Sequence, residues 1–212
     1  MAEGKEKKIY ISSIGFKEGD ISYKTIEALN DSDIIINTSV HSKFIDKYLT
    51  QKKHIININE MANGLSAKKY KKLLVKTIEK IIKLKKYGII TTLFPGNPFF
   101  ITIDSYLFHN IDRLAKKNDI KPIYLTSTSS FDYLTNLLRT RFDKMLKHLL
   151  SFFYASDFLK FEEKGLDITK FNLLIFSFTD TKHKNKIIDS LIRSFGKKHK
   201  SYLIKENCLT QP

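Results

Sequence analysis

Cysteine is almost absent from this 212-residue sequence, which has a single one, Cys208. One cysteine cannot form an intrachain disulfide, nor can it supply the cysteine pairs of a zinc knuckle. The six histidines show no HExxH pattern and no other close ligand spacing. The sequence therefore predicts neither an intrachain disulfide nor a protein-bound metal.

Long hydrophobic runs are also missing. No apolar stretch approaches the roughly 20 residues that a helix needs to cross a bilayer. Residues 1–8, MAEGKEKK, are too polar and too short for a secretory signal. We therefore expect a soluble, cytoplasmic protein with no membrane association. Its 42% hydrophobic residues are enough to fill a substantial core.

Several common phosphate-binding and nucleophile loops are absent as well. The sequence has no GxxxxGK[ST] loop and no GxSxG elbow, which excludes P-loop proteins and α/β-hydrolases. The segment SSIGFKEGD, residues 12–20, follows the first predicted strand, but it is not GxGxxG. Asn37 and Thr38 stand at the end of the second predicted strand, where a dinucleotide-binding fold has an acidic residue. The sequence therefore disfavours that fold.

Acidic residues are few beside basic ones: 22 against 37, which gives a net charge of +15. A cationic surface attracts the phosphates of nucleic acids. The lysine clusters are, however, spread along the chain on helical patterns, where such runs usually face solvent. They lie at 68–72, 83–86, 182–186 and 197–200. RNA binding therefore stays a less favoured alternative.

Apolar runs that alternate with helical patterns predict an α/β fold in the first half of the chain. The predicted strands are 9–13, 33–38, 54–58, 89–94 and 123–126. The predicted helices are 22–30, one or two turns within 42–49, 66–86 and about 105–117. Because helices separate the strands, we expect a mostly parallel sheet that is covered on both faces.

The second half predicts a different arrangement. A helix over 130–150, apolar segments at 152–161 and 171–178, a helix over 185–195 and a final strand at 201–204 indicate a mixed sheet. No low-complexity linker separates the two halves. We expect two firmly packed α/β lobes, an N-terminal lobe of residues 1–122 and a C-terminal lobe of residues 123–212.

The segment TTLFPGNPFFIT, residues 91–102, is the best candidate for a binding loop. It places Pro95, Gly96 and Pro98 within four residues, although the chain has only 4 prolines and 8 glycines. In open α/β sheets, ligands bind beyond the carboxyl ends of the strands. Glycine there lets a ligand approach the main chain, and proline fixes the shape of the loop. An ordinary tight turn between strand and helix is the alternative interpretation.

The order of these segments resembles the tetrapyrrole methylase family. The matching stretches are the first strand with Gly15, the helix start at 19–22, ALNDSDII at 28–35, and GNPFF at 96–100. The resemblance implies a two-lobed, homodimeric methyltransferase that binds S-adenosylmethionine in a cleft between its lobes. The GDP- or GHP-type cofactor loop of the family corresponds to residues 96–98. TSTSS at 126–130 stands where the family has proline-glycine-x-serine followed by serine or alanine.

Within that family, the sequence is similar to the peptide backbone N-methyltransferases of the borosin type. The similarity lies in FFYASDFLKF at 152–161 and ENCLTQP at 206–212. It implies methylation of a peptide backbone amide. No C-terminal substrate segment is visible, so the substrate would be a separate precursor peptide. The chain also stops where relatives continue with another strand, so we expect a C-terminal lobe without its last strands.

The match to the borosin enzymes is incomplete at the residues that would carry the chemistry. Tyr70 matches a tyrosine early in the long helix of the first lobe, but Ser66 or Ala67 replaces the arginine expected there. Pro95 replaces the tyrosine that precedes the cofactor loop. An amide nitrogen needs a base and a group that stabilises the carbonyl oxygen, and Tyr70 supplies at most half of that.

The resemblance and the sequence together define the candidate site. The expected cofactor-binding residues are Gly96, Asn97, Pro98, Phe99, Thr102, Ser129 and Ser130. On the acceptor side, Tyr70 is the candidate catalytic residue, and Tyr23 and Tyr154 are candidates for substrate binding. Two alternatives stay open. One is a cofactor-binding or inactive methylase-like interaction partner, favoured by the missing arginine; the other is an RNA-directed methyltransferase, favoured by the charge.

Overall fold

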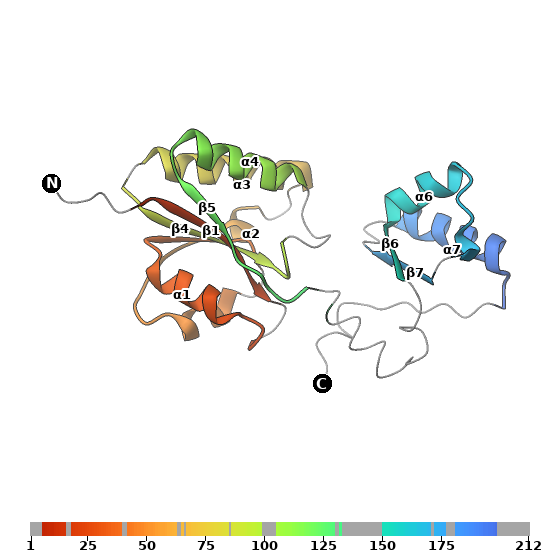
Figure 1. The fold of residues 1–212 in the computed structure, drawn as a ribbon, viewed down its shortest axis with the longest axis horizontal. Coiled ribbons are helices and arrows are strands. Elements are labelled where there is room, and N and C mark those ends of the chain that lie inside the picture. The colour runs from red at the N-terminus through yellow and green to blue at the C-terminus, as the bar shows by residue number, and fades with distance from the viewer. Residues whose placement is uncertain are drawn as a thin grey trace. The chain divides into compact units, whose positions relative to one another are not determined.

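The chain divides into two compact units, Met1–Asp132 and Tyr133–Pro212 (Figure 1). The computed structural model describes residues 6–15, 18–39, 42–62, 65, 67–84, 86–98, 105–129, 132, 150–170, 172–176 and 181–198. The division predicted after residue 122 falls inside the strand Lys121–Tyr124. That strand pairs with the first strand of the chain, so it belongs to the sheet of the first unit.

The first unit is built on a five-stranded sheet with the order β3-β2-β4-β1-β5. Its strands are β1 (Lys8–Gly15), β2 (Ile34–Asn37), β3 (His54–Asn57), β4 (Ile89–Pro95) and β5 (Lys121–Tyr124). Every pair of neighbouring strands is parallel, as the alternation of strands and helices predicts. The strands are rich in isoleucine, whose branched side chain suits a sheet that is buried on both faces.

Helices cover both faces of this sheet. They are α1 (Tyr23–Asp31), the 3₁₀ helix η1 (Ser42–Tyr48), the short α2 (Ile58–Met61), α3 (Ala67–Lys83) and α4 (Ser105–Lys117). Figure 1 shows α1 on one side of the sheet and α3 with α4 on the other. Right-handed crossovers explain this arrangement, because the chain first moves from β1 to β2 and β3, and then back to β4 and β5.

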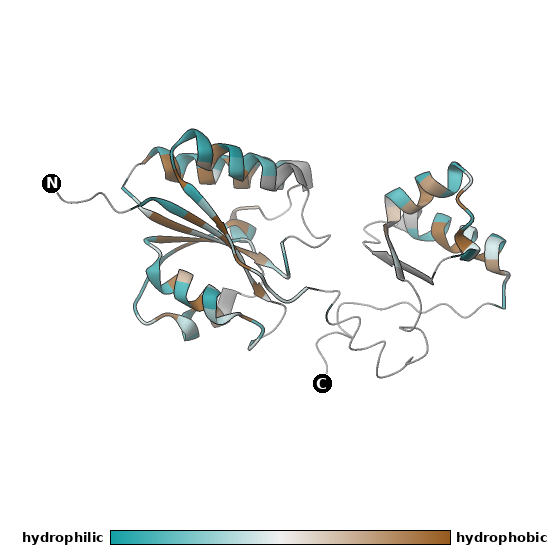
Figure 2. Cartoon of the chain, viewed as in Figure 1, coloured by the Kyte–Doolittle hydropathy of each residue, from teal (hydrophilic) through white to brown (hydrophobic). Residues whose placement is uncertain are grey.

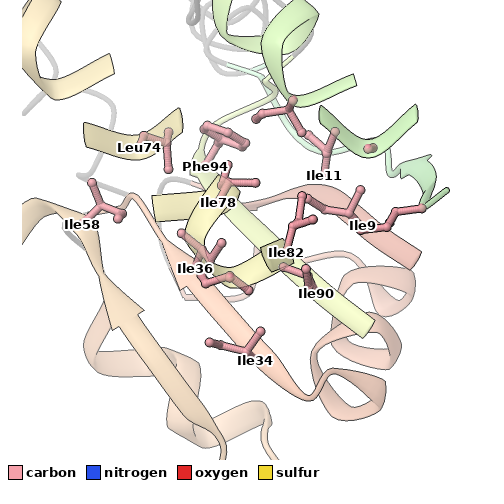
Figure 3. Close-up of a cluster of buried hydrophobic side chains, with 14 residues drawn as sticks. Ile9, Ile11, Ile34, Ile36, Ile58, Leu74, Ile78, Ile82, Ile90 and Phe94 are labelled. Carbon is pink, nitrogen blue, oxygen red and sulfur yellow. The ribbon is translucent and has the colours of Figure 1, made fainter. Parts of the chain in front are cut away.

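Each face of the sheet has its own core. The larger core lies under α3 and α4 and includes Ile11, Ile78 and Phe94, all of them almost completely buried (Figure 3). The smaller core lies under α1 and η1 and includes Leu29 and Leu93. Successive residues of a strand point to opposite faces, so Leu93 and Phe94 of β4 contribute to different cores.

Two neighbouring threonines of β4 allow a direct test of buried polar groups. The Thr91 hydroxyl pairs with that of Ser32 and donates to the Ala28 carbonyl at 3.3 Å. Thr92 is 0% exposed, and its hydroxyl has no partner among the described residues. Valine has the shape of threonine without the hydroxyl. We expect Thr92→Val to raise the free energy of unfolding by about 1 kcal/mol, and Thr91→Val to lower it by about 1–2 kcal/mol.

Urea denaturation of both variants checks this prediction. The two positions are adjacent on one strand and undergo the same chemical change, so each serves as the control for the other. A destabilised Thr92→Val protein would contradict the assignment of an unpartnered hydroxyl.

The second unit has a parallel pair of strands with helices beside it. Its described elements are β6 (Leu150–Tyr154), α6 (Ala155–Glu163), the 3₁₀ helix η3 (Ile168–Lys170), β7 (Asn172–Phe176) and α7 (Thr181–Phe195). Strands β6 and β7 are parallel. Phe158 and Ile187 are fully buried in its core. The predicted strand at 201–204 lies outside the described residues, as does almost all of the predicted helix at 130–150.

Candidate functional site

The loop after β4 stands at the point where the connections of the sheet diverge. Strand β4 lies between β1 and β2 in the sheet. The chain leaves β1 and β2 toward the face covered by α1 and η1, whereas it leaves β4 toward the face covered by α4 (Figure 1). In open α/β sheets, ligands bind beyond the carboxyl ends of strands at such a switch point. The sheet topology therefore places residues 95–98 where a ligand is expected.

Gly96 turns the main chain at this point. Its φ of 63° lies in the left-handed region, which glycine adopts without steric cost. Pro95 pairs with Gly15 of β1, and the Gly96 N–H points to the Gly15 carbonyl at 3.5 Å. Gly96 and Pro98 are buried, and Asn97 is half-buried. The loop is therefore packed against the end of β1.

The loop that follows β1 is equally constrained. Gly15 has a φ of 79°, and its N–H donates to the Ser13 hydroxyl at 2.8 Å. Farther along, the Gly19 N–H donates to the Tyr48 hydroxyl at 3.1 Å. Glu18 accepts from Lys47 of η1 at 2.8 Å. The two loops that flank the switch point thus each turn on a left-handed glycine, and η1 holds the far end of the loop after β1.

A cluster of side-chain amides joins the ends of β2 and β3. The Asn37 amide nitrogen donates to the Ser39 carbonyl and to the Asn57 Oδ1, both at 3.0 Å. The Asn37 Oδ1 accepts the Ser39 N–H, also at 3.0 Å. Asn59 donates to the Thr38 carbonyl at 2.7 Å. The main chain just beyond β2 is therefore fixed by uncharged hydrogen bonds.

Tyr70 lies near the start of α3 and reaches the same segment. Its hydroxyl donates to the Thr38 carbonyl at 3.4 Å, a long hydrogen bond. Burial raises the pKa of Tyr70, and the nearby Thr38 side chain offsets part of that increase. The phenol therefore keeps its proton at neutral pH and acts as a hydrogen-bond donor rather than as a base.

Tyr23 lies on the other face of the sheet. It is 74% exposed at the start of α1, whose N-cap Ser22 accepts the Thr25 N–H at 3.2 Å. It lines a groove of about 620 Å³ along α1, together with Tyr10 and Leu125. Since α1 and α3 cover opposite faces, the structure separates Tyr23 from Tyr70.

Ser129 belongs to a local hydrogen-bonded turn. Its N–H and its hydroxyl donate to the Asp132 carboxylate at 2.6 and 2.7 Å, and its hydroxyl accepts the Asp132 N–H at 3.2 Å. This reciprocal pattern has the form of a capping box. Ser129 is buried, with 5% of its surface exposed. Its hydroxyl is thus engaged in positioning the main chain after β5.

Four candidate residues cannot be placed in the site. Phe99, Thr102 and Ser130 lie outside the described residues. Tyr154 ends β6 in the second unit, and its side chain is likewise outside the description. In the part of the chain that the structure describes, no group of three or more His, Cys, Asp or Glu side chains is placed to hold a metal ion. No helix of that part is long and apolar enough to span a membrane.

The amide cluster is the part of the site that the sequence analysis did not identify. In the sequence, Asn37 and Thr38 indicated only that the acidic residue of a dinucleotide-binding fold is missing. A signal was present, since NTS at 37–39 and NINE at 57–60 each begin at the last residue of a short isoleucine-rich strand. Polar residues at the carboxyl ends of parallel strands lie at the same edge of the sheet. They contact one another only if their strands are neighbours, as β2 and β3 are.

Comparison with known proteins supports the fold. No protein-family model and no curated protein matches the sequence. The solved structure of the methyltransferase CobJ is similar over 89% of this chain and 77% of its own, with a TM-score of 0.59 and 11% identity. Uroporphyrin-III C-methyltransferase from Thermus thermophilus is similar over 71% of this chain and 61% of its own, with a TM-score of 0.49 and 12% identity.

The cobalamin biosynthetic enzyme cobalt precorrin-4 methyltransferase, CbiF, is similar over 62% of this chain and 50% of its own. Its TM-score is 0.46 and its identity is 13%. The likeness to CobJ shows that this chain has a tetrapyrrole-methylase-like α/β fold, which confirms the predicted fold class. At 11% identity this likeness concerns the fold alone.

Proposed function

We propose that this protein is an S-adenosylmethionine-dependent methyltransferase that holds the methionine moiety of its cofactor against the main chain of residues 96–98. The observation that carries the proposal is the left-handed Gly96 in a Pro-Gly-Asn-Pro loop at the switch point of the sheet. Without a side chain at this position, a ligand can contact main-chain N–H and C=O groups directly. Such groups suit an amino-acid moiety, which has both donors and acceptors.

The end of β2 lies beside β4, because the Thr38 N–H and hydroxyl donate to the Leu93 carbonyl at 2.9 and 2.8 Å. Asn37 bonds Ser39 and Asn57, and Asn59 bonds the Thr38 carbonyl, all through uncharged groups. The Asn57 amide nitrogen also donates to the Glu60 carboxylate at 3.0 Å. A prearranged set of neutral donors and acceptors suits the hydroxyl and amino groups of a nucleoside. When bound, the cofactor supplies an activated methyl group on a sulfonium. The contribution of the chain is then to orient cofactor and acceptor, which by itself accelerates a reaction.

We further propose that the acceptor is a peptide backbone amide, as the similarity to the borosin enzymes implies. Tyr70 would donate its hydroxyl to the amide carbonyl of the substrate and so stabilise negative charge on that oxygen. Its raised pKa supports this role, because the donor proton is retained at neutral pH. Its hydrogen bond to Thr38 is long, at 3.4 Å, and so is easily exchanged for a substrate.

A second candidate is a methylase-like protein that binds the cofactor without turning it over. It is favoured by the same property of Tyr70, which leaves this residue unable to act as the base that an amide requires. The missing arginine at Ser66 or Ala67 favours it as well. The predicted homodimer, the precursor peptide and the cytoplasmic location remain predictions from the sequence.

Calorimetric titration of the full chain with S-adenosylmethionine and with S-adenosylhomocysteine tests the proposal. We expect saturable binding of both, and a loss of about tenfold or more in affinity for Gly96→Asn. Asparagine tolerates the left-handed conformation better than most residues, so a loss of affinity is attributed to the added side chain rather than to a disallowed φ. Gly165→Asn is the matched control, because Gly165 is also left-handed, with a φ of 84°, and nothing lies within 4 Å of a Cβ built on it.

The outcomes separate the candidates. No saturable binding to the full chain, or an equal loss of affinity in both variants, would refute the proposed site. If the cofactor binds, incubation with peptides and mass spectrometry follow. A gain of one methyl group on a backbone amide, lost in Tyr70→Phe with cofactor affinity unchanged, supports the peptide acceptor. Binding without methylation supports the second candidate.

A further inference from the structure

A row of lysines covers the outer face of α3. Its members are Lys69, Lys72, Lys76, Lys80 and Lys83, all exposed and spaced by three or four residues. At 100° per residue they fall within an arc of ~80° on the side opposite to the buried Leu74 and Ile78. Figure 2 shows hydrophilic residues, in teal, alternating with hydrophobic ones, in brown, along the helical layer of α3 and α4.

The lysine row has little compensating negative charge. Glu79 pairs with Lys83 at 2.8 Å, and on α4 Asp112 pairs with Lys116 at 2.6 Å. Within the described residues, no carboxylate lies within ion-pair distance of the other four members of the row. Exposed Arg113 and Lys117 of α4 add further positive charge to the same helical layer.

This arrangement is unfavourable for the helix alone. Like charges three or four residues apart repel one another on a helix surface. An anionic partner would relieve the repulsion. The row is about 21 Å long, which suits a chain of phosphates better than a single small anion.

The burial of α3 argues against a membrane as this partner. Helices that bind anionic lipids insert an apolar face into the bilayer. The apolar face of α3 is instead packed against the sheet, where Leu74 and Ile78 are 0% exposed (Figure 3). Lysine, a compact point charge, suits contact with phosphates irrespective of base sequence. We propose that the lysine row is a docking surface for the phosphate backbone of a nucleic acid, RNA in the first instance.

Fluorescence anisotropy of the full chain with a labelled single-stranded RNA of mixed sequence tests the proposal, without cofactor and at several salt concentrations. The test variant replaces Lys69, Lys72, Lys76 and Lys80 with glutamine, a good helix former. The control variant replaces Lys24, Lys52, Lys164 and Lys184, which are also exposed, so the net charge is the same in both. Circular dichroism establishes that both variants are folded.

For the row variant we expect a loss of affinity of about tenfold or more at low salt. The slope of log affinity against log salt should become shallower by about 3, because four phosphate contacts on a single strand each contribute about 0.7. The control variant should lose less than about threefold. Equal losses in both variants, or no RNA binding at low salt, would overturn the proposal. So would a row variant that loses binding to anionic lipid vesicles but keeps its affinity for RNA.

Discussion

Replacement of Gly15 with alanine is expected to lower the free energy of unfolding by roughly 3–4 kcal/mol. A Cβ atom at this position would lie 2.2 Å from the Cβ of Asp20 and 3.2 Å from its main-chain carbonyl carbon. A residue with a Cβ would also have to keep a φ of 79°. The loop between β1 and α1 would therefore have to move, and with it the end of β1 that packs against residues 95 and 96.

Gly19→Ala in the same loop is the matched control. Gly19 is also left-handed, with a φ of 92°, but nothing lies within 4 Å of a Cβ built on it. Its replacement should lower the free energy of unfolding by about 1–2 kcal/mol, which is the cost of a left-handed φ without a steric clash. Urea denaturation of the two variants thus isolates the clash with Asp20. Asp20→Gly, which removes the opposing Cβ, should restore part of the stability of Gly15→Ala; equal losses at Gly15 and Gly19 would contradict this account.

Phe94→Ala is expected to lower the free energy of unfolding by about 3–5 kcal/mol. Phe94 is 1% exposed and is among the largest side chains of the core under α3 and α4 (Figure 3). Its removal leaves a cavity among isoleucine and leucine side chains that cannot fully close. Because Phe94 directly precedes Pro95, the same change should also loosen the candidate cofactor loop and weaken the binding of S-adenosylmethionine.

Phe94→Leu is the control for volume, since it keeps most of the apolar contact and should cost about 1–1.5 kcal/mol. Thermal or chemical denaturation measures both losses. If alanine cost no more than leucine, the ring would not fill the core as the structure shows. A loss of cofactor affinity in the alanine variant alone would link the packing of this core to the loop.

Local sequence predicted the position of the Pro-Gly-Asn-Pro loop in the fold but not its place in the sheet. Two prolines and a glycine after an apolar run predicted a rigid loop at a strand end, and residues 96–98 do follow β4, which ends at Pro95. The sequence could not show that β4 lies between β1 and β2. That order depends on pairing between strands more than 50 residues apart, such as Ile36 with Thr92. No local pattern encodes this pairing, and it is what makes the loop a switch point.

The three tyrosine candidates illustrate the same limit. Tyr23, Tyr70 and Tyr154 were grouped on one acceptor side, but Tyr23 and Tyr70 lie on helices that cover opposite faces of the sheet. The face that a helix covers depends on the direction of the crossover, and that direction follows from the order of the strands. Ser129 likewise has a local role, because its hydroxyl is bonded to Asp132.

The sequence by itself determined the strands and helices of the first unit, because the spacing of its apolar residues and the positions of glycine and proline between them are local properties. Strands β1 to β4 and helices α1, α3 and α4 begin and end close to the predicted residues. Tertiary structure alone decided which strand ends meet and which faces of the sheet the helices cover. Those outcomes depend on non-local burial and strand pairing, which bring together residues far apart in the chain.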